Sequence, residues 1–178
     1  MILQAAASML AGEVGMIALR EGDDYYVRAV IGVDAEQAHL FDPLLEDLSP
    51  RTAGEFDLSL LQAKMRRVAR MVDLNLRQVV ALPMVVANNM LGILFIFRSY
   101  AGTPTENDNR LLQSFADQAA IAVHNARMYE FANQERQRLA AILDHSADGV
   151  MILDEDLHVG RWNRALSRIT GWQAEQAQ

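Results

Sequence analysis

The sequence predicts an α+β fold, in which an antiparallel sheet is flanked by helices. A hairpin pattern spans residues 79–98, where two runs rich in Val, Ile, Leu and Phe flank Asn88 and Asn89, and Asn tolerates the positive φ of a tight turn. A long helical pattern follows the break at Gly102 and Pro104. The chain of 178 residues is 51% hydrophobic, which is enough apolar material for a packed core.

The N-terminal part of the chain predicts a helix and a further hairpin. Residues 1–10 place apolar side chains at helical spacing, and Gly12 follows where a helix typically ends. Residues 14–20 and 25–33 are strand-like runs on either side of a turn of Glu, Gly and Asp. Strict alternation in the second run places Tyr25, Val27, Ala29 and Ile31 on one face of the sheet, and Tyr26, Arg28 and Val30 on the other.

The segment between the two hairpins predicts one amphipathic helix. Its apolar positions are Leu58, Leu61, Met65, Val68 and Val72. The basic residues around this stripe are Lys64, Arg66, Arg67 and Arg70. Together with Arg77, these arginines could hold an anion through paired hydrogen bonds, or they could form an ordinary solvated face. The solvated face is the preferred interpretation.

A long helix is predicted from Thr105, which stands three residues before Asp108 as an N-cap with an acidic first turn. No Gly or Pro follows until Gly149, so the helix is expected to continue past residue 130 as a weak heptad. One apolar stripe with alanine in its middle recurs at steps of three and four, at Leu112, Phe115, Ala119, Ala122, Ala126 and Tyr129.

The run LPMVVANNMLGILFIF, the TxxD helix start and LLQSFADQAAIAVHNARMYE together resemble the C-terminal half of a GAF domain covering residues 1–130. This resemblance implies a sensory domain whose ligand cavity is covered by residues 35–77. The glycine-rich loop and short strands typical of that stretch are not recognisable here, and the NKFDE-type signature of cyclic-nucleotide-binding members is not visible. The resemblance therefore names no ligand.

The run LAAILDHSADGVMILDEDLHVGRWNRALSRITGW resembles the opening of a PAS domain. About 40 residues of that resemblance are present, whereas domains of this size class typically run to roughly 100 or more. The chain is therefore expected to end inside this domain. The expected organisation is a GAF-like domain at 1–130, a connecting signalling helix at 131–143, and a truncated PAS-like tail at 144–178.

Composition excludes several kinds of chemistry. The chain has no cysteine, which excludes disulfides, thiolate zinc sites, cysteine nucleophiles and a covalently attached bilin or haem, and leaves any other cofactor unknown. The net charge of −7 argues against nucleic-acid binding. Residues 1–63 carry eleven acids against three bases, whereas residues 64–98 carry one acid against six bases. No apolar run is long enough to span a bilayer, so no membrane contact and a cytoplasmic location are expected.

No residues form a convincing catalytic or metal-binding pattern, so this chain is not expected to be an enzyme. The four histidines lie far apart in sequence, and the paired acids fall at turns. A small-molecule pocket is expected under residues 35–77, with Tyr26, Arg28 and Arg77 as its polar lining.

The resemblance implies a sensory input module of a bacterial signal-transduction protein, which relays a signal through a dimeric helix. The homodimer is expected to pair through Phe115, Ala119, Ala122, Ala126 and Tyr129. Catalysis would then belong to an output domain beyond this chain, such as a histidine kinase or a diguanylate cyclase. The alternative is a ligand-free dimerisation module, whose cavity is filled by its own Leu, Met and Phe side chains.

Overall fold

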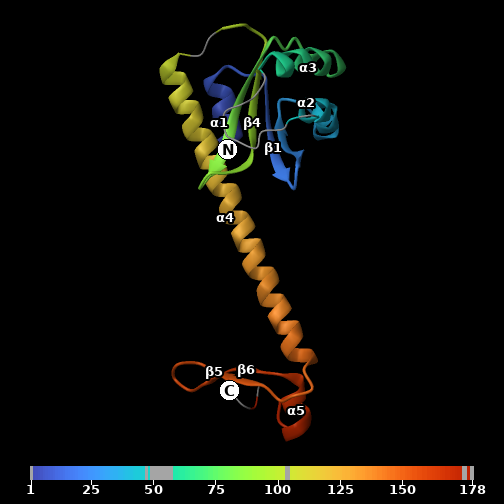
Figure 1. Cartoon of the computed structure of the whole chain (residues 1–178), viewed down its shortest axis with the longest axis vertical. Helices are drawn as coiled ribbons and strands as arrows, with labels where there is room; N and C mark the ends of the chain where they lie inside the picture. Colours follow the sequence, from blue (N-terminus) through green and yellow to red (C-terminus); the bar gives the residue numbers. More distant parts are fainter. Residues whose placement is uncertain (1, 47, 49–57, 103–104, 174–175, 177–178) are drawn as a thin grey trace. The chain divides into compact units, whose positions relative to one another are not determined.

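The computed structural model describes residues 2–46, 48, 58–102, 105–173 and 176. The chain divides into two compact units, Met1–Asn125 and Ala126–Gln178. One continuous helix, α4 (Glu106–His145), begins in the first unit and ends in the second (Figure 1). No helix in the described part of the chain is long and apolar enough to cross a membrane.

The first unit is built on a four-stranded antiparallel sheet. Its strands are β1 (Val14–Glu21), β2 (Asp24–Ile31), β3 (Gln78–Val86) and β4 (Asn89–Arg98), in the spatial order β2-β1-β4-β3. Each hairpin pairs its own two strands, and the pairing of β1 with β4 joins the hairpins. The predicted α+β class is confirmed.

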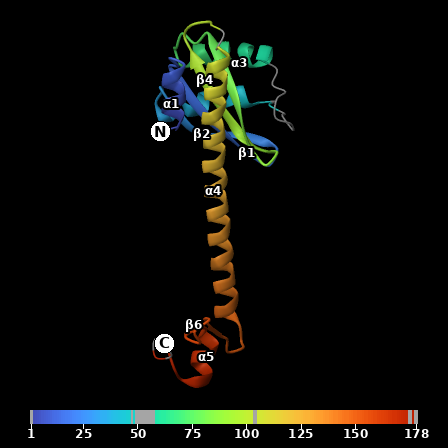
Figure 2. The same cartoon turned by 90° about the vertical axis from the view of Figure 1, so that its left-hand side faces the viewer.

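Helices cover both faces of this sheet (Figure 1 and Figure 2). One face carries α1 (Ile2–Met9) and the first part of α4, and Leu112 of α4 packs there with Leu94 of β4. The other face carries η1 (Ala35–Phe41), α2 (Asp42–Leu45) and α3 (Leu58–Met71), and Met65 of α3 packs there with Phe95 of β4. All residues of β4 after Asn89 are buried, because its side chains alternate between these two apolar layers.

The structure contains the amphipathic helix predicted between the hairpins and the helix start predicted at Thr105. In α3, the apolar residues Leu61, Met65 and Val68 are buried, and so is Val72 just beyond the end of the helix. The side chain of Leu58 lies outside the described residues. At the start of α4, the Asp108 N–H donates to Thr105 Oγ1 at 3.2 Å. The Thr105 N–H and hydroxyl donate to the Asp108 carboxylate at 2.9 and 2.8 Å, and these bonds lower the pKa of Asp108.

The turn between β3 and β4 lies one residue earlier than predicted. Val86 pairs with Asn89, so the two central turn residues are Ala87 and Asn88, with φ of 47° and 66°. Both values are positive, as a two-residue hairpin turn requires. Asn89 is the first residue of β4 and not part of the turn. Two consecutive asparagines offer two turn positions one residue apart, and strand pairing selects between them.

A β-bulge interrupts β2 and corrects the predicted alternation. Ile17 pairs with Ala29 and Ala18 pairs with Val27, so Arg28 is an extra residue opposite β1. The extra residue exchanges the faces of the strand beyond it. Val30 therefore packs in the layer that contains Tyr25, whereas Ile31 packs in the opposite layer. The prediction that Ile31 and Ala29 share a face with Tyr25 is wrong for this reason.

The second unit contains the end of α4, the hairpin β5 (Met151–Leu153) and β6 (Val159–Trp162), and α5 (Arg164–Thr170). Asn163 organises it. Its side-chain oxygen accepts from the Val150 and Leu166 N–H groups, both at 2.9 Å. Its side-chain nitrogen donates to the carbonyls of Leu143 and Asp148 at 2.8 and 2.9 Å. Asn163 thus caps α5 and ties the last turns of α4 to the hairpin.

Candidate ligand pocket and signalling helix

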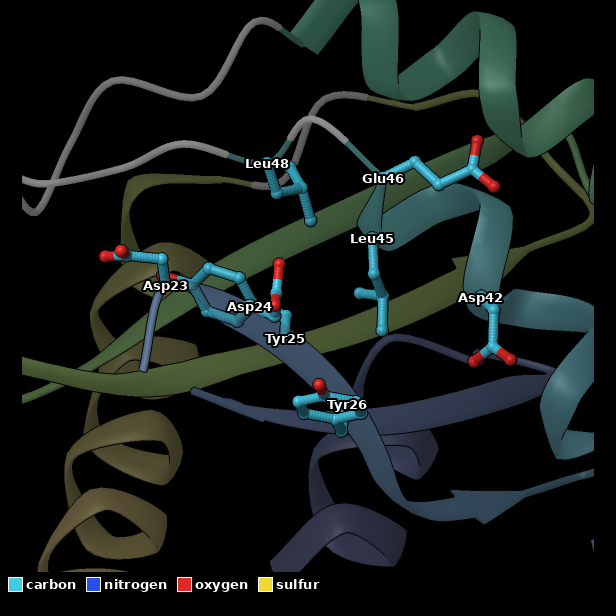
Figure 3. A pocket seen from close by; sticks show the side chains of 8 residues that line it. All are labelled: Asp23, Asp24, Tyr25, Tyr26, Asp42, Leu45, Glu46 and Leu48. Carbon is cyan, nitrogen blue, oxygen red and sulfur yellow. The ribbon is translucent and has the colours of Figure 1, made fainter. Parts of the chain in front are cut away.

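A pocket of about 500 Å³ lies where the start of β2 faces α2 and the residues that follow it (Figure 3). Its volume falls within the range common for small-molecule sites. The described residues that line it are Asp23, Asp24, Tyr25, Tyr26, Asp42, Leu45, Glu46 and Leu48. In Figure 3, Leu45 and Leu48 project from one wall, and Asp24 and Tyr25 project from the opposite one.

The lining of this pocket is acidic. Among the described residues, this lining contains four carboxylates and no Lys, Arg or His. Asp23 pairs with Arg20 at 3.4 Å, whereas the carboxylates of Asp24, Asp42 and Glu46 have no ion-pair partner in the described part of the chain. Among the described residues, no group of three or more His, Cys, Asp or Glu side chains is arranged to hold a metal ion. The carboxylates therefore surround the pocket without converging on a single point.

Tyr25 contributes an unsatisfied hydroxyl to this site. The residue is only 7% exposed, and its hydroxyl is buried without a hydrogen-bond partner. Burial raises the pKa of this phenol, an effect that the nearby Arg20 charge partly opposes. The phenol is therefore neutral near pH 7 and keeps both a donor and an acceptor for a partner.

The structure brings together two of the three predicted ligand residues. Tyr26 lines the pocket and is 46% exposed. The Arg28 guanidinium lies 5.7 Å from the centre of the Tyr26 ring and forms an ion pair with Glu21, but Arg28 does not line the pocket. Arg77 precedes β3, at the opposite edge of the sheet from β2, and is not part of this lining.

Sequence reasoning missed the acidic residues and Tyr25. Asp23 and Asp24 were readily explained as turn residues, since Asp is favoured there by local hydrogen bonds. Asp42 and Glu46 belong to a segment without a recognisable family pattern. The one available signal was the excess of acids over residues 1–63, which indicates the sign of the charge but not which carboxylates meet.

The space between α3 and the sheet is filled by side chains of the chain itself. Phe41 and Phe97 lie with their ring centres 5.5 Å apart, and Phe95 and Phe97 at 6.2 Å. Met65 of α3 is fully buried in the same layer. The 500 Å³ pocket is thus at the β2 edge of the sheet and not in the middle of this layer.

The five residues predicted for a dimer seam along α4 have different environments. Ala119 is 4% exposed and packs against the sheet of its own unit, and Phe115 packs partly against the same layer. Ala122 and Ala126 are exposed, and Tyr129 is 75% exposed. Only these last three side chains are open to another helix.

A further apolar stripe on α4 was not predicted as a seam. Met128, Phe131, Leu139 and Ile142 are all large apolar residues of the second unit, and all are exposed. Their spacing resembles a heptad, with Met128 and Ile142 two heptads apart. At about 100° per residue, this stripe is centred roughly 150° away from Ala122, Ala126 and Tyr129. Along α4 the two sets therefore mark different faces.

The family models and solved structures that match the chain agree with this architecture. The model of the GAF domain matches residues 1–125, and the model of the PAS fold matches residues 137–178. A domain of a protein described as a two-component sensor histidine kinase from Sinorhizobium meliloti is 15% identical, with a TM-score of 0.52 over 75% of this chain and 92% of that one.

Two further solved structures are similar. The GAF domain/HD domain protein from Geobacter sulfurreducens is 18% identical, with a TM-score of 0.50 over 72% of this chain and 91% of that one. A cyanobacteriochrome GAF domain is 15% identical, with a TM-score of 0.50 over 71% and 87% of the two chains. At these identities the likeness shows a shared fold. No curated protein matches the chain.

Proposed function

The chain belongs to the GAF domain family, and on that premise we propose that it is the sensory input part of a bacterial signal-transduction protein, binding a small ligand and relaying the signal along α4 as a homodimer. The GAF and PAS parts are sensory and not catalytic. Catalysis would reside in an output domain such as a histidine kinase or a diguanylate cyclase, and the location would be cytoplasmic.

The observation that carries this proposal is the continuity of α4. Its first turns are buried against the sheet through Leu112, Ala116 and Ala120, and the same helix ends in the second unit, where the Leu143 carbonyl accepts from Asn163. A continuous helix transmits a displacement or a rotation of one end to the other. A ligand can bias such an element only by binding its two arrangements with different affinity.

For the dimer, we propose that α4 pairs with the α4 of a second copy along one of its two exposed apolar faces. The larger side chains favour the stripe of Met128, Phe131, Leu139 and Ile142, since large apolar groups contribute the most free energy when buried. The seam predicted from the sequence, with Ala122, Ala126 and Tyr129, is the competing face. For both faces we propose a parallel pairing, in which the two copies place the same residues at the same level.

Single charges placed on each face distinguish the two seams. We would measure the mass of the intact chain by light scattering and native mass spectrometry for Phe131→Glu, Ala126→Glu and Gln134→Glu. Gln134 is exposed and lies on neither proposed seam, so it serves as the matched control. The stripe predicts that Phe131→Glu is monomeric while both other variants remain dimeric. A wild-type monomer at micromolar concentration would refute the helix-pairing relay.

A ligand-free relay module is the second candidate, because the layer under α3 is already filled by Phe41, Met65 and Phe95. In that case the module would couple a partner protein, and not a small molecule, to α4. Native mass spectrometry of freshly purified protein separates the two functions. Extra mass retained on the dimer supports ligand sensing, and a clean dimer that no small molecule stabilises supports the ligand-free relay.

A further inference from the structure

We propose that the pocket between β2 and α2 binds an organic cation, that is, a small primary or quaternary amine with an apolar body. This inference rests on the proposed sensing function and adds the chemical class of the ligand. It also places the site at the β2 edge of the sheet, since the layer under α3 is filled.

Charge is the first argument. Four carboxylates line the pocket, and three cations contact its lining residues. Arg20 pairs with Asp23, and Lys64 donates to the backbone carbonyl of Glu46. Arg28 lies over the Tyr26 ring and is itself paired with Glu21. Even with all three cations counted, the acids are in excess, and low-dielectric walls focus their field in the hollow. An anionic ligand would meet this repulsion, whereas a cation would be attracted.

The second argument is the hydroxyl of Tyr25, which is independent of the acids. Because the Tyr25 hydroxyl is buried and has no partner, a ligand that displaces the atoms covering it recovers free energy by bonding to it. The neutral phenol oxygen can accept a hydrogen bond from an ammonium N–H or donate one to a ligand hydroxyl. Asp24 and Tyr25 both belong to β2, and both line the pocket.

The third argument is the shape and polarity of the remaining lining. Leu45 and Leu48 form one wall opposite Asp24 and Tyr25 (Figure 3), which suits an apolar body next to a charged head. Aromatic rings bind ammonium groups through their negative faces, and Tyr26 already carries the Arg28 guanidinium in this way. The spread of the carboxylates favours an extended organic cation over a single metal ion.

The test is calorimetric titration of the intact chain with putrescine, choline and agmatine. The neutral carbon analogue of choline, 3,3-dimethylbutan-1-ol, and acetate serve as controls for size and for the sign of the charge. The expected result is that at least one amine binds and neither control does. Raising the salt concentration should weaken the binding, because exposed charges are screened.

Three variants test where the amine binds. Asp24→Asn should weaken amine binding about tenfold, as expected for the loss of a charge-assisted contact. Tyr25→Phe should weaken it about fivefold, yet leave the free protein as stable as before or more stable, because it removes an unsatisfied buried hydroxyl. Asp144→Asn, an exposed acid of α4, is the matched control and should bind as the wild type does.

Each outcome bears on the proposal. Equal binding of the neutral analogue, or binding of acetate alone, would overturn the cation assignment while leaving ligand sensing intact. Amine binding that Asp24→Asn and Tyr25→Phe leave unchanged would overturn this location. Failure of all three amines to bind would also overturn the proposal. Whether the freshly purified dimer retains extra mass in native mass spectrometry then tests the sensing function separately.

Discussion

Replacing Asn163 with Ala should unfold the hairpin and α5 of the second unit far more often than in the wild type. The side chain is 1% exposed and forms four hydrogen bonds to main-chain groups. Alanine removes all four bonds at once. The N–H groups of Val150 and Leu166 and the carbonyl groups of Leu143 and Asp148 then lose this partner.

The size of the effect follows from these bonds. Loss of the N-cap of α5 costs about 1 kcal/mol, and the three remaining bonds contribute a further 2 kcal/mol or so once water has relieved part of the loss. A total of about 3 kcal/mol raises the open population of this segment roughly a hundredfold. Asn163→Asp keeps the acceptor oxygen and loses both donors. It therefore distinguishes the contribution of the bonds accepted from Val150 and Leu166 from that of the bonds donated to Leu143 and Asp148.

Hydrogen exchange followed by mass spectrometry measures this directly. Peptides covering 150–170 should exchange roughly a hundredfold faster in Asn163→Ala, and peptides covering 79–98 should not change. Asn133→Ala, at an exposed position of α4, is the matched control and should exchange as the wild type does. If Asn163→Ala alters exchange less than about threefold, the hydrogen-bond reasoning fails. If Asn163→Asp matches the wild type, the bonds to Leu143 and Asp148 contribute nothing.

Two further predictions concern the first unit. The pKa of Asp108 is lowered from 3.8 chiefly by the hydrogen bond from Thr105, so this carboxylate stabilises the fold above that pH, and its contribution is lost as the pH falls through the lowered pKa. Thermal melts at about pH 7 and about pH 3 should therefore differ less in Asp108→Asn than in the wild type, and an equal difference would contradict the role of the cap. A Cβ on Gly92 would lie 2.3 Å from the Ala18 carbonyl oxygen, so Gly92→Ala should lower the free energy of unfolding in urea by about 2 kcal/mol. Gly102→Ala, whose nearest neighbour would be 3.5 Å away, is the control, and equal losses in both variants would rule out the steric explanation.

Local patterns were sufficient for most elements of the fold, although η1 and α2 were not predicted. Apolar spacing predicted α3, and the Thr105 and Asp108 pair predicted the start of α4, because capping and burial along one helix depend on residues a few positions apart. The bulge at Arg28 could not be predicted in this way. It is a property of the register in which β1 and β2 pair, and no residue type in β2 signals it.

The site was harder to predict, since it depends on strand order. Tyr26 and Arg77 were expected in one lining, but β2 and β3 form opposite edges of the sheet. Edge positions follow from how the two hairpins pair, which is a long-range property. Asp42 and Glu46 reach the pocket only because α2 follows η1 directly and faces β2.

Strand β4 contributes side chains to both apolar layers of the first unit. Phe95 packs in the layer next to the pocket, whereas Leu94 and Ile96 pack in the layer under α4. A shift of this strand would therefore disturb the packing of both layers. A substitution in β4 that adapts the proposed pocket to a new ligand would also change the packing of α4. In the sensor proposed above, ligand preference would therefore change more easily at the β2 edge, where Asp24 and Tyr26 can vary without moving β4. The strand order would then allow ligand preference to diversify while the proposed relay along α4 stays constant.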